Sequence, residues 1–287
     1  MSLSVISLLY LYLINNLYME RKMNKFKYSS MFAFTTVFLM TACSNGSMDQ
    51  PEAVTEVADV TYYNQFLPCT PGPDYSPENM RQMIVEWNSL EVMSDDLVWA
   101  GGYAPKGDSN GQDNGWWELQ WPSKEAADVA WEAWMADDVA QAWDKESDAV
   151  LECDNSAVSS WTFKTPGAES PDFDFSYFAT ETYPCNLNDG MSSEDLMAVA
   201  EKYNNWVAEN GTAEAYFYGI YEALDEDAMF DFLWLNFHQS FEGLEAGNAN
   251  FAENGGDMQA SFDKVASCRT PDFYDSAEFR NLISDAS

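Results

Sequence analysis

Four cysteines occur as two pairs with nearly the same spacing, and this regularity constrains the fold more than any other feature of the chain. Cys69 and Cys153 lie 84 residues apart, and Cys185 and Cys268 lie 83 residues apart. Each pair opens with a Pro-Cys dipeptide, and the two dipeptides are 116 residues apart. A recurring spacing of this kind indicates an internal repeat. We therefore expect one structural unit to be present twice.

Aromatic residues between the cysteines support the same repeat. The residues that align at the offset of 116 are Trp87-Asn88 and Tyr203-Asn204. The residues that align at an offset of 115 are Trp117 with Phe232 and Leu119 with Trp234. Few of these matches would carry weight alone, but their common spacing favours a duplication.

Apolar periodicity and turn residues predict the same order of elements, β-α-β-β-α-β, in both copies. In the first copy we expect strands over residues 62–67, 97–104, 116–121 and 158–163, and helices that begin after Ser76 and Ser123. In the second copy we expect strands over residues 175–183, 213–222, 229–238 and 269–274, and helices over 192–208 and 241–265. Asn254-Gly255-Gly256 should break the last helix. The helix after Ser123 should be continuous, with a buried stripe formed by Ala127, Trp131, Trp134, Val139 and Trp143.

This element order is that of the split β-α-β, or ferredoxin-like, unit. We assign residues 61–166 to the first unit and 173–283 to the second. In this topology the end of the first strand faces the beginning of the fourth. An exported chain should oxidise its cysteines, and four cysteines allow three pairings. Only Cys69–Cys153 with Cys185–Cys268 agrees with both the repeat and the topology.

Two such units in one chain resemble the dimeric α/β-barrel superfamily of the antibiotic-biosynthesis-monooxygenase type. The resemblance covers roughly residues 60–275 and rests on element order and duplication, without a diagnostic motif. It implies an α+β fold in which both units form one barrel, so that the monomer is an intramolecular pseudo-dimer. The superfamily includes monooxygenases, haem-degrading enzymes, isomerases, cyclases and proteins with no known activity. The fold alone therefore does not select a function.

Residues 23–43 are typical of a bacterial secretion signal, which would make residues 1–43 a signal segment. Lys25 and Lys27 precede a short apolar run, and Thr41-Ala42 precede Cys43. This resembles the lipoprotein signal family, whose cysteine becomes the acylated first residue, although Met40 stands where leucine is usual. The alternatives are an ordinary cleavable signal or a membrane anchor, but the apolar run is shorter than the ~20 residues of a spanning helix.

Residues 1–22 carry a second apolar run that fits this signal badly. We expect translation to begin at Met19 or Met23, with a real first membrane helix as the alternative. Residues 44–60 have no apolar period and are predicted to be a flexible tether. The resemblance to proteobacterial lipoproteins, with Ser44 after the cysteine, favours the outer membrane of a Gram-negative envelope, facing the periplasm or the surface. The partner of this segment would be the membrane, through the lipid at Cys43.

The chain is strongly acidic, with 48 acidic against 13 basic side chains and a formal net charge of −35. Such a charge repels phosphate backbones, so we exclude nucleic acid as a partner. It favours cationic partners over anionic ones. Hydrophobic residues make up 46% of the chain, which is too many for a disordered acidic protein, so packed cores are expected.

His238 is the one histidine in the sequence and therefore the candidate for imidazole chemistry. Strand alternation places Trp234, Asn236 and His238 on one face of a strand, and at the offset of 115 Ser123 stands opposite His238 in the first copy. An Asn, Trp and His near one pocket resemble the haem-degrading and cofactor-independent oxygenase members of the superfamily. We name these three as catalytic candidates. The alternative is a strand-end histidine with a purely structural role.

Other residue patterns carry weaker functional interpretations. Tyr216, Tyr218 and Tyr221 are predicted to line a ligand pocket, because a buried tyrosine hydroxyl needs a partner. Trp131, Trp134 and Trp143 are predicted to be core. Residues 107–115 have alternating oxygen side chains but lack the glycine and closing glutamate of a calcium loop, so a hairpin loop is expected. The sequence indicates no metal and no cofactor.

Two functional hypotheses follow. In the first, an exported, lipid-anchored α/β-barrel protein binds a small apolar or aromatic molecule in the barrel. If this protein is an enzyme, the bound molecule is its substrate and the reaction is monooxygenase-like or isomerase-like. In the second, a non-catalytic envelope lipoprotein holds a protein partner through its acidic, aromatic surface. The sequence does not decide whether a reaction is catalysed. An aromatic cavity reached by His238 would favour the first hypothesis, whereas a filled barrel and an exposed apolar patch would favour the second.

Overall fold

The computed structural model describes residues 61–107, 114–165, 172–211 and 214–281. The predicted signal segment 1–43 with Cys43 and the predicted tether 44–60 lie outside the described residues, as do positions 108–113 of the oxygen-rich loop. Within the described ranges, no helix combines the length and the apolar character that a membrane crossing requires.

The two halves of the chain have the same order of elements. The first half contains β1 (Thr61–Pro71), α2 (Pro77–Ser89), β2 (Trp99–Pro105), β3 (Gly115–Trp121), α3 (Lys124–Ala136), α4 (Asp138–Ser147), β4 (Leu151–Cys153) and β5 (Ser159–Lys164). The second half contains β6 (Phe178–Leu187), α5 (Ser193–Asn210), β7 (Tyr216–Ala223), β8 (Phe232–His238), α6 (Phe241–Asn254), α7 (Gly256–Val265), β9 (Ala266–Cys268) and β10 (Asp272–Asn281).

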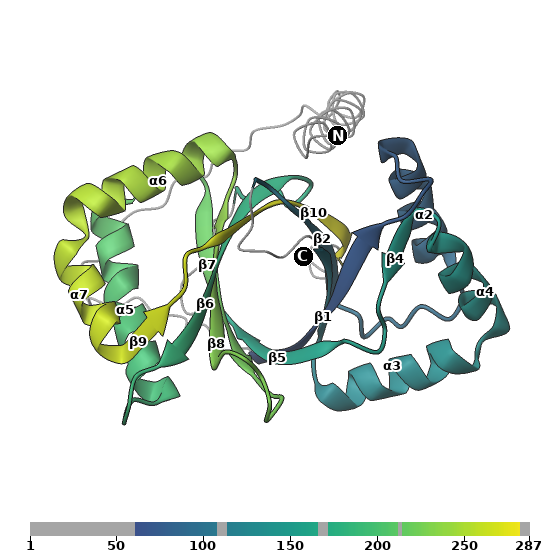
Figure 1. Ribbon diagram of the computed structural model, residues 1–287, viewed down its shortest axis with the longest axis horizontal. Coiled ribbons are helices and arrows are strands. Elements are labelled where there is room, and N and C mark those ends of the chain that lie inside the picture. The colour runs from purple at the N-terminus through teal and green to yellow at the C-terminus, as the bar shows by residue number, and fades with distance from the viewer. Residues whose placement is uncertain (1–60, 108–113, 166–171, 212–213, 282–287) are drawn as a thin grey trace, which may run out of the picture.

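The strands form one large antiparallel sheet that closes on itself (Figure 1). The first half contributes the order β2-β3-β1-β5 and the second half β7-β8-β6-β10. β5 pairs with β7, and β10 pairs with β2, so that the two halves complete one ring. Helices α2, α3 and α4 cover the outer face of the first half, and α5, α6 and α7 cover that of the second (Figure 1). The protein is therefore a mixed α+β barrel with an outer layer of helices.

Side-chain caps explain where most helices begin. Ser76, Ser123, Ser192 and Ser240 each accept a hydrogen bond from a backbone N–H in the first turn. Such caps satisfy N–H groups that the helix leaves unpaired. The predicted continuous helix after Ser123 is wrong, because Asp137 adopts an extended conformation and its carboxylate caps a new helix through Ala140 N, 2.8 Å away. The break predicted near Gly255 is present between α6 and α7.

The cysteines pair within each half as predicted. Cys69 lies opposite Cys153 on β4, and Cys185 lies opposite Cys268 on β9. Both short strands precede the long fourth strand of their half, so Cys153 and Cys268 belong to an added segment and not to β5 or β10. The Cα atoms are 4.0 Å apart in each pair. Directly opposed residues of an antiparallel pair approach to ~4.5 Å, which explains why this distance is shorter than that of most disulfides.

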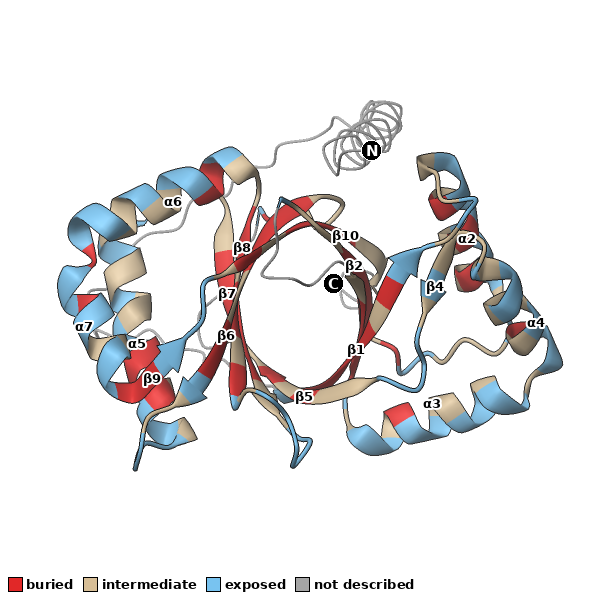
Figure 2. Ribbon diagram, in the orientation of Figure 1, coloured by how far each residue is buried: buried red, intermediate tan, exposed pale blue. Residues whose placement is uncertain are grey.

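The interior of the barrel is filled by aromatic side chains. A buried cluster contains Phe66, Trp99, Tyr103, Trp161, Phe163, Phe173, Phe178, Phe217, Tyr221, Leu235, Phe237 and Tyr274. Figure 2 shows the strands of the ring as predominantly buried. A barrel of eight strands is just wide enough for side chains to fill it. This packing argues against the expectation that a ligand binds inside the barrel.

One carboxyl group is buried within this aromatic interior. Glu118 is 1% exposed and accepts hydrogen bonds from Asn64 Nδ2, Tyr103 Oη and Tyr221 Oη. Burial raises its pKa from the ordinary value of 4.5 to about 7, although the three hydrogen bonds oppose the shift. Asn64 Oδ1 lacks a partner among the described groups. A half-turn of the Asn64 amide would present that oxygen to a protonated Glu118.

Removing either disulfide should destabilise the protein substantially. In the entropic description, closing a loop of 84 or 83 residues is worth about 4 to 5 kcal/mol. We expect Cys69→Ser/Cys153→Ser and Cys185→Ser/Cys268→Ser each to lower the unfolding free energy by several kcal/mol in urea titrations. Unreduced peptide mapping that joined Cys69 to Cys185 would contradict the pairing.

Replacing Glu118 by glutamine should change how stability depends on pH. The folded pKa of about 7 exceeds the unfolded value of 4.5, so the contribution of Glu118 is fully present below pH 4.5 and is lost as pH rises through 7. Glu118→Gln cannot ionise. Between pH 4.5 and 8 it should therefore gain up to about 3 kcal/mol relative to wild type. Parallel stability curves for the two proteins over this range would show that Glu118 does not titrate as described.

Candidate functional site

A large cavity lies outside the barrel, between the sheet of the second half and its helices. Its volume is about 530 Å³. Strand alternation turns Leu235 and Phe237 of β8 into the barrel and Trp234, Asn236 and His238 toward the helices. The aromatic side chains that line the cavity are Tyr183, Tyr203, Trp206, Tyr216, Phe232, Trp234, Phe251 and Phe262. The three catalytic candidates named from sequence thus share one wall of one cavity.

Asn236 is the centre of a hydrogen-bond network on this wall. Its Oδ1 accepts from Tyr216 Oη at 2.8 Å and from Trp234 Nε1 at 2.9 Å. Its Nδ2 donates to Glu181 Oε2 at 3.0 Å. A network in which every member is satisfied holds its side chains in one arrangement. Asn236 therefore positions the neighbouring rings, and its own polar atoms are already in use.

Glu181 is the buried acid of this network. It lies opposite Asn236 in the pairing of β6 with β8 and is 1% exposed. Tyr183 Oη and Asn248 Nδ2 both donate to its Oε1 at 2.9 Å. No basic side chain of the described residues forms an ion pair with it. Hydrogen bonds alone therefore compensate the burial of this carboxyl group.

His238 has a different environment at the end of the same wall. It is 5% exposed, and its ring lies 4.7 Å from that of Tyr216, centre to centre. Among the described residues, no side chain or backbone group forms a hydrogen bond with its imidazole. Burial lowers its pKa from 6.5 to about 4, so the ring is neutral at neutral pH and has one N–H donor and one nitrogen acceptor. The imidazole therefore lines the cavity with both nitrogen atoms unengaged by the described residues.

A glycine on the facing helix allows that helix to lie close to the His238 ring. A Cβ atom at Gly247 of α6 would lie 3.0 Å from His238 Cε1 and 3.7 Å from Nδ1. Any larger residue would therefore press against the imidazole.

Cys268 and Arg269 line the other end of the cavity, because Cys268 pairs with Cys185 on β6 whereas His238 pairs with Ala179. The exposed Arg269 guanidinium lies 5.4 Å from the centre of the Phe230 ring.

The three tyrosines predicted to line a pocket occupy three different environments. Tyr216 lines the cavity. Tyr218 faces the same way but is packed beneath Trp234, with ring centres 4.4 Å apart, and donates to Asn204 Oδ1 at 2.7 Å. Tyr221 points into the barrel and donates to Glu118. The structure therefore brings only Tyr216 together with His238.

Three important residues of this site were not identified from the sequence. They are Glu181, Tyr203 and Gly247. Glu181 carried a detectable signal, since it is an acid within the apolar strand from Phe178 to Leu187. Tyr203 was aligned with Trp87 but was not recognised as a cavity residue. Gly247 is one of several glycines, and sequence alone does not show what lies opposite it.

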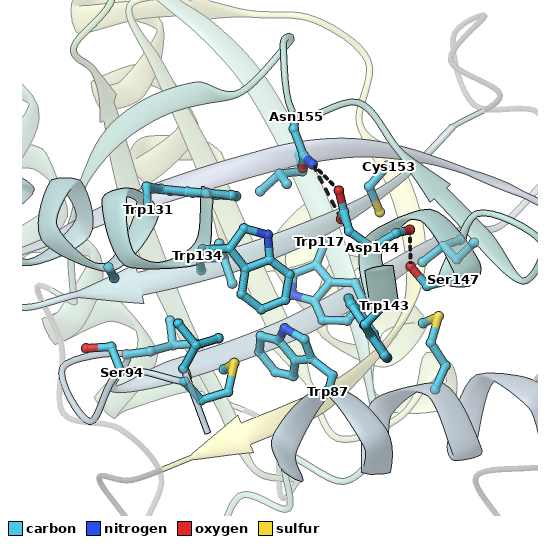
Figure 3. Close-up of a pocket in the computed structure, with 18 of the residues that line it drawn as sticks. Trp87, Ser94, Trp117, Trp131, Trp134, Trp143, Asp144, Ser147, Cys153 and Asn155 are labelled. Atoms are coloured by element: carbon cyan, nitrogen blue, oxygen red, sulfur yellow. Dashed lines mark hydrogen bonds between the residues drawn. The ribbon is translucent and has the colours of Figure 1, made fainter. Parts of the chain in front are cut away.

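The first half contains a much smaller pocket in the equivalent place, with a volume of about 90 Å³ (Figure 3). Trp121 pairs with Tyr63, and His238 pairs with Ala179, which is 116 residues after Tyr63. Trp121 is thus the counterpart of His238, and by the same register Trp117 is the counterpart of Trp234. Strands β3 and β8 are therefore offset by 117 residues. The sequence alignment at an offset of 115, which set Ser123 against His238, was wrong by two residues.

Comparisons with known proteins find similarity only to solved structures. No family model matches the chain, and no curated protein matches it. A chlorite dismutase variant from Candidatus Nitrospira defluvii is 10% identical with a TM-score of 0.46, over 77% of this chain and 93% of that chain. A heme-binding protein from Thermus thermophilus is 11% identical with a TM-score of 0.44, over 78% of this chain and 96% of that chain. A candidate monooxygenase from Lactobacillus acidophilus is 8% identical with a TM-score of 0.47, over 77% of this chain and 95% of that chain.

These similarities are distant. Each TM-score is below 0.5, so they decide neither the ligand nor the activity of this chain.

His238→Gln should make the protein less sensitive to acid. The folded pKa of about 4 lies below the unfolded 6.5, so the contribution of the neutral ring is present above pH 6.5 and is lost as pH falls to 4. Between pH 7 and 4, wild type should lose up to about 3 kcal/mol more than the variant. Urea titrations at these pH values measure the difference. An identical loss in both proteins would place the imidazole in contact with solvent.

Proposed function

We propose that this protein binds a small, largely aromatic or apolar molecule in the cavity between β8 and helices α5, α6 and α7. The observation that carries the proposal is the free imidazole of His238 at the end of an aromatic cavity of about 530 Å³. Ligand sites are typically apolar cavities of ~300–1,000 Å³ with a few polar groups that fix orientation. Here the aromatic rings supply contact area, and His238 supplies the directional hydrogen bond.

The chemistry of the walls restricts the ligand further. Asn236 and Glu181 are engaged with each other, so the polar group of the ligand meets His238. Arg269 is the one cationic side chain among the described residues that line the cavity, and it can pair with an acidic substituent at the outer end. Asp263 also lines the cavity, but its carboxylate already accepts a hydrogen bond from Gln259 at 2.7 Å. The ligand that fits best is therefore a flat molecule with an acceptor or donor at its inner end and a negative charge at its outer end.

A haem group is a second candidate ligand, favoured by the same imidazole. A neutral histidine with a free nitrogen in an apolar site is the usual axial ligand of haem iron, and the aromatic walls and Arg269 suit a porphyrin ring and its acidic groups. Bound haem would supply redox chemistry, and His238 would hold its iron. Haemin titrated into the protein should then produce a Soret band that His238→Ala abolishes. A band that is unchanged in the variant would remove haem as a candidate.

The context of this site in the envelope is also part of the proposal. We infer that the two halves are copies of one unit, that the chain functions as a monomeric pseudo-dimer, and that it is exported and anchored through a lipid on Cys43. Monooxygenase-like or isomerase-like turnover would depend on His238, because its neutral imidazole can orient a substrate through a hydrogen bond. The filled barrel and exposed apolar side chains such as Val129, Met135 and Val139 favour the rival hypothesis of a partner-holding lipoprotein, but they leave the outer cavity available.

Closing the cavity should abolish binding without unfolding the protein. In Gly247→Leu the new side chain would occupy the space next to His238. Leucine has a higher helix propensity than the glycine that it replaces, so we expect α6 to remain folded. We expect at least a tenfold loss of affinity for the aromatic anion 8-anilinonaphthalene-1-sulfonate, measured by fluorescence. Ala249→Leu is the matched control, since Ala249 is exposed on the same helix. Equal affinity in both variants would move the ligand away from this cavity.

Anchoring through Cys43 has its own test. Cys43→Ser removes the thiol that would be acylated, so the variant should be released from membranes or remain unprocessed. Fractionation of cells followed by immunoblotting measures this. A variant that is processed and still sediments with membranes would remove the lipid anchor from the proposal.

A further inference from the structure

The small pocket of the first half has walls of indole rings that meet nearly at right angles. Trp87 of α2 and Trp117 of β3 have ring centres 5.0 Å apart and planes at 76°. Trp134 of α3 and Trp143 of α4 have ring centres 5.8 Å apart and planes at 84°. These four rings come from four elements, and Trp121 of β3 and Trp131 of α3 line the pocket as well. Perpendicular rings form adjacent walls of a box rather than a stack.

The break between α3 and α4 is what brings Trp134 and Trp143 together. In a continuous helix, nine residues correspond to about 2.5 turns, which would place these two side chains on opposite faces. Asp137 ends α3 and starts α4, so the second helix returns toward the pocket. The pocket therefore depends on a specific break in the chain and is not a by-product of one apolar stripe.

The polar part of this pocket is acidic. Asp144 and Asp148 line it, and no lysine, arginine or histidine does so among the described residues. Figure 3 shows Asp144, Ser147 and Asn155 on one side of the pocket, and the rings of Trp87, Trp131 and Trp134 on the other. Asn155 Nδ2 donates to the Asp144 carboxylate at 3.1 Å. Burial raises the pKa of Asp144, and nearby Asp148 adds to the effect, because no positive charge compensates the carboxylate.

We propose that this pocket binds the methylated ammonium head of a small organic cation, between the four indole rings and Asp144. Indole faces attract cations through the ring quadrupole, and a desolvated contact strengthens that attraction. A fully methylated, quaternary ammonium group suits such a box, because it has no N–H group that requires an acceptor. The volume of about 90 Å³ suits a head group of a few heavy atoms and not a large ligand. The net charge of −35 draws cations toward the protein.

Choline and its neutral isostere 3,3-dimethylbutan-1-ol test this site directly, because they share a shape and differ in charge. Calorimetric titration of the full-length protein should show choline binding at least tenfold more tightly than the alcohol. Asp144→Asn retains an oxygen that accepts from Asn155 but removes the charge, and it should weaken choline roughly tenfold without affecting the alcohol. Trp134→Leu should weaken choline to a similar degree.

Asp128→Asn is the matched control for the change in net charge. Asp128 lies on α3, is exposed and pairs with Lys124 outside the pocket. It should leave choline affinity unchanged. The proposal is overturned if choline and the alcohol bind equally, if wild type binds neither, or if Asp144→Asn and Asp128→Asn have the same effect. Because Gly247 lies in the other half, a failure of ligand binding in the second cavity would not produce any of these outcomes.

Discussion

An eight-stranded barrel leaves an interior that side chains alone can fill, and the rest of this structure depends on that limit. Every strand must turn one set of side chains inward, and here those side chains are aromatic and packed around Glu118. Because these side chains occupy the interior, the room for a ligand described here lies on the outer face of the sheet, beneath the helices. Both cavities described here lie in that layer.

The two halves use equivalent positions for different purposes. Where the second half has His238, the first half has Trp121, whose indole donates to Gln65 at 3.1 Å. The cavity of the second half is large and has the His238 imidazole at one end. In the first half, tryptophan side chains leave only a small pocket. In both halves the second helix is broken, at Asp137 and at Gly255. One scaffold thus presents two pockets of different size and different lining residues.

The fold was predictable to a large extent, because its signals are local or repeated. Serine caps at Ser76 and Ser123, strand alternation in β8 and the equal cysteine spacing all correspond to features of the structure. The break at Asp137 was missed, since an aspartate within an apolar pattern does not show whether it caps a new helix or faces solvent. The true offset of 117 residues between β3 and β8 was missed as well. A difference of one or two residues in loop length shifts a sequence alignment without changing the fold.

The candidate site was predictable only in part. Alternation placed Trp234, Asn236 and His238 on one face correctly. The same reasoning did not show that this face meets helices rather than the interior of the barrel, because both faces of these strands are apolar. Tyr221 was assigned to the pocket with Tyr216 and Tyr218. It lies an odd number of residues from both along β7, so its side chain points to the opposite face of the strand. Partners such as Glu181 and Gly247 come from other elements, and their proximity depends on tertiary packing.

The central claim is that ligands of this protein bind outside the barrel, beneath the helices of the second half. Electron density in crystals of the protein purified from its native source tests this most directly. The account predicts density between β8 and α6 that reaches hydrogen-bond distance of the His238 imidazole. Ligand density inside the barrel beside Glu118 would contradict it, and so would a cavity that holds only water while the bound molecule lies elsewhere on the protein.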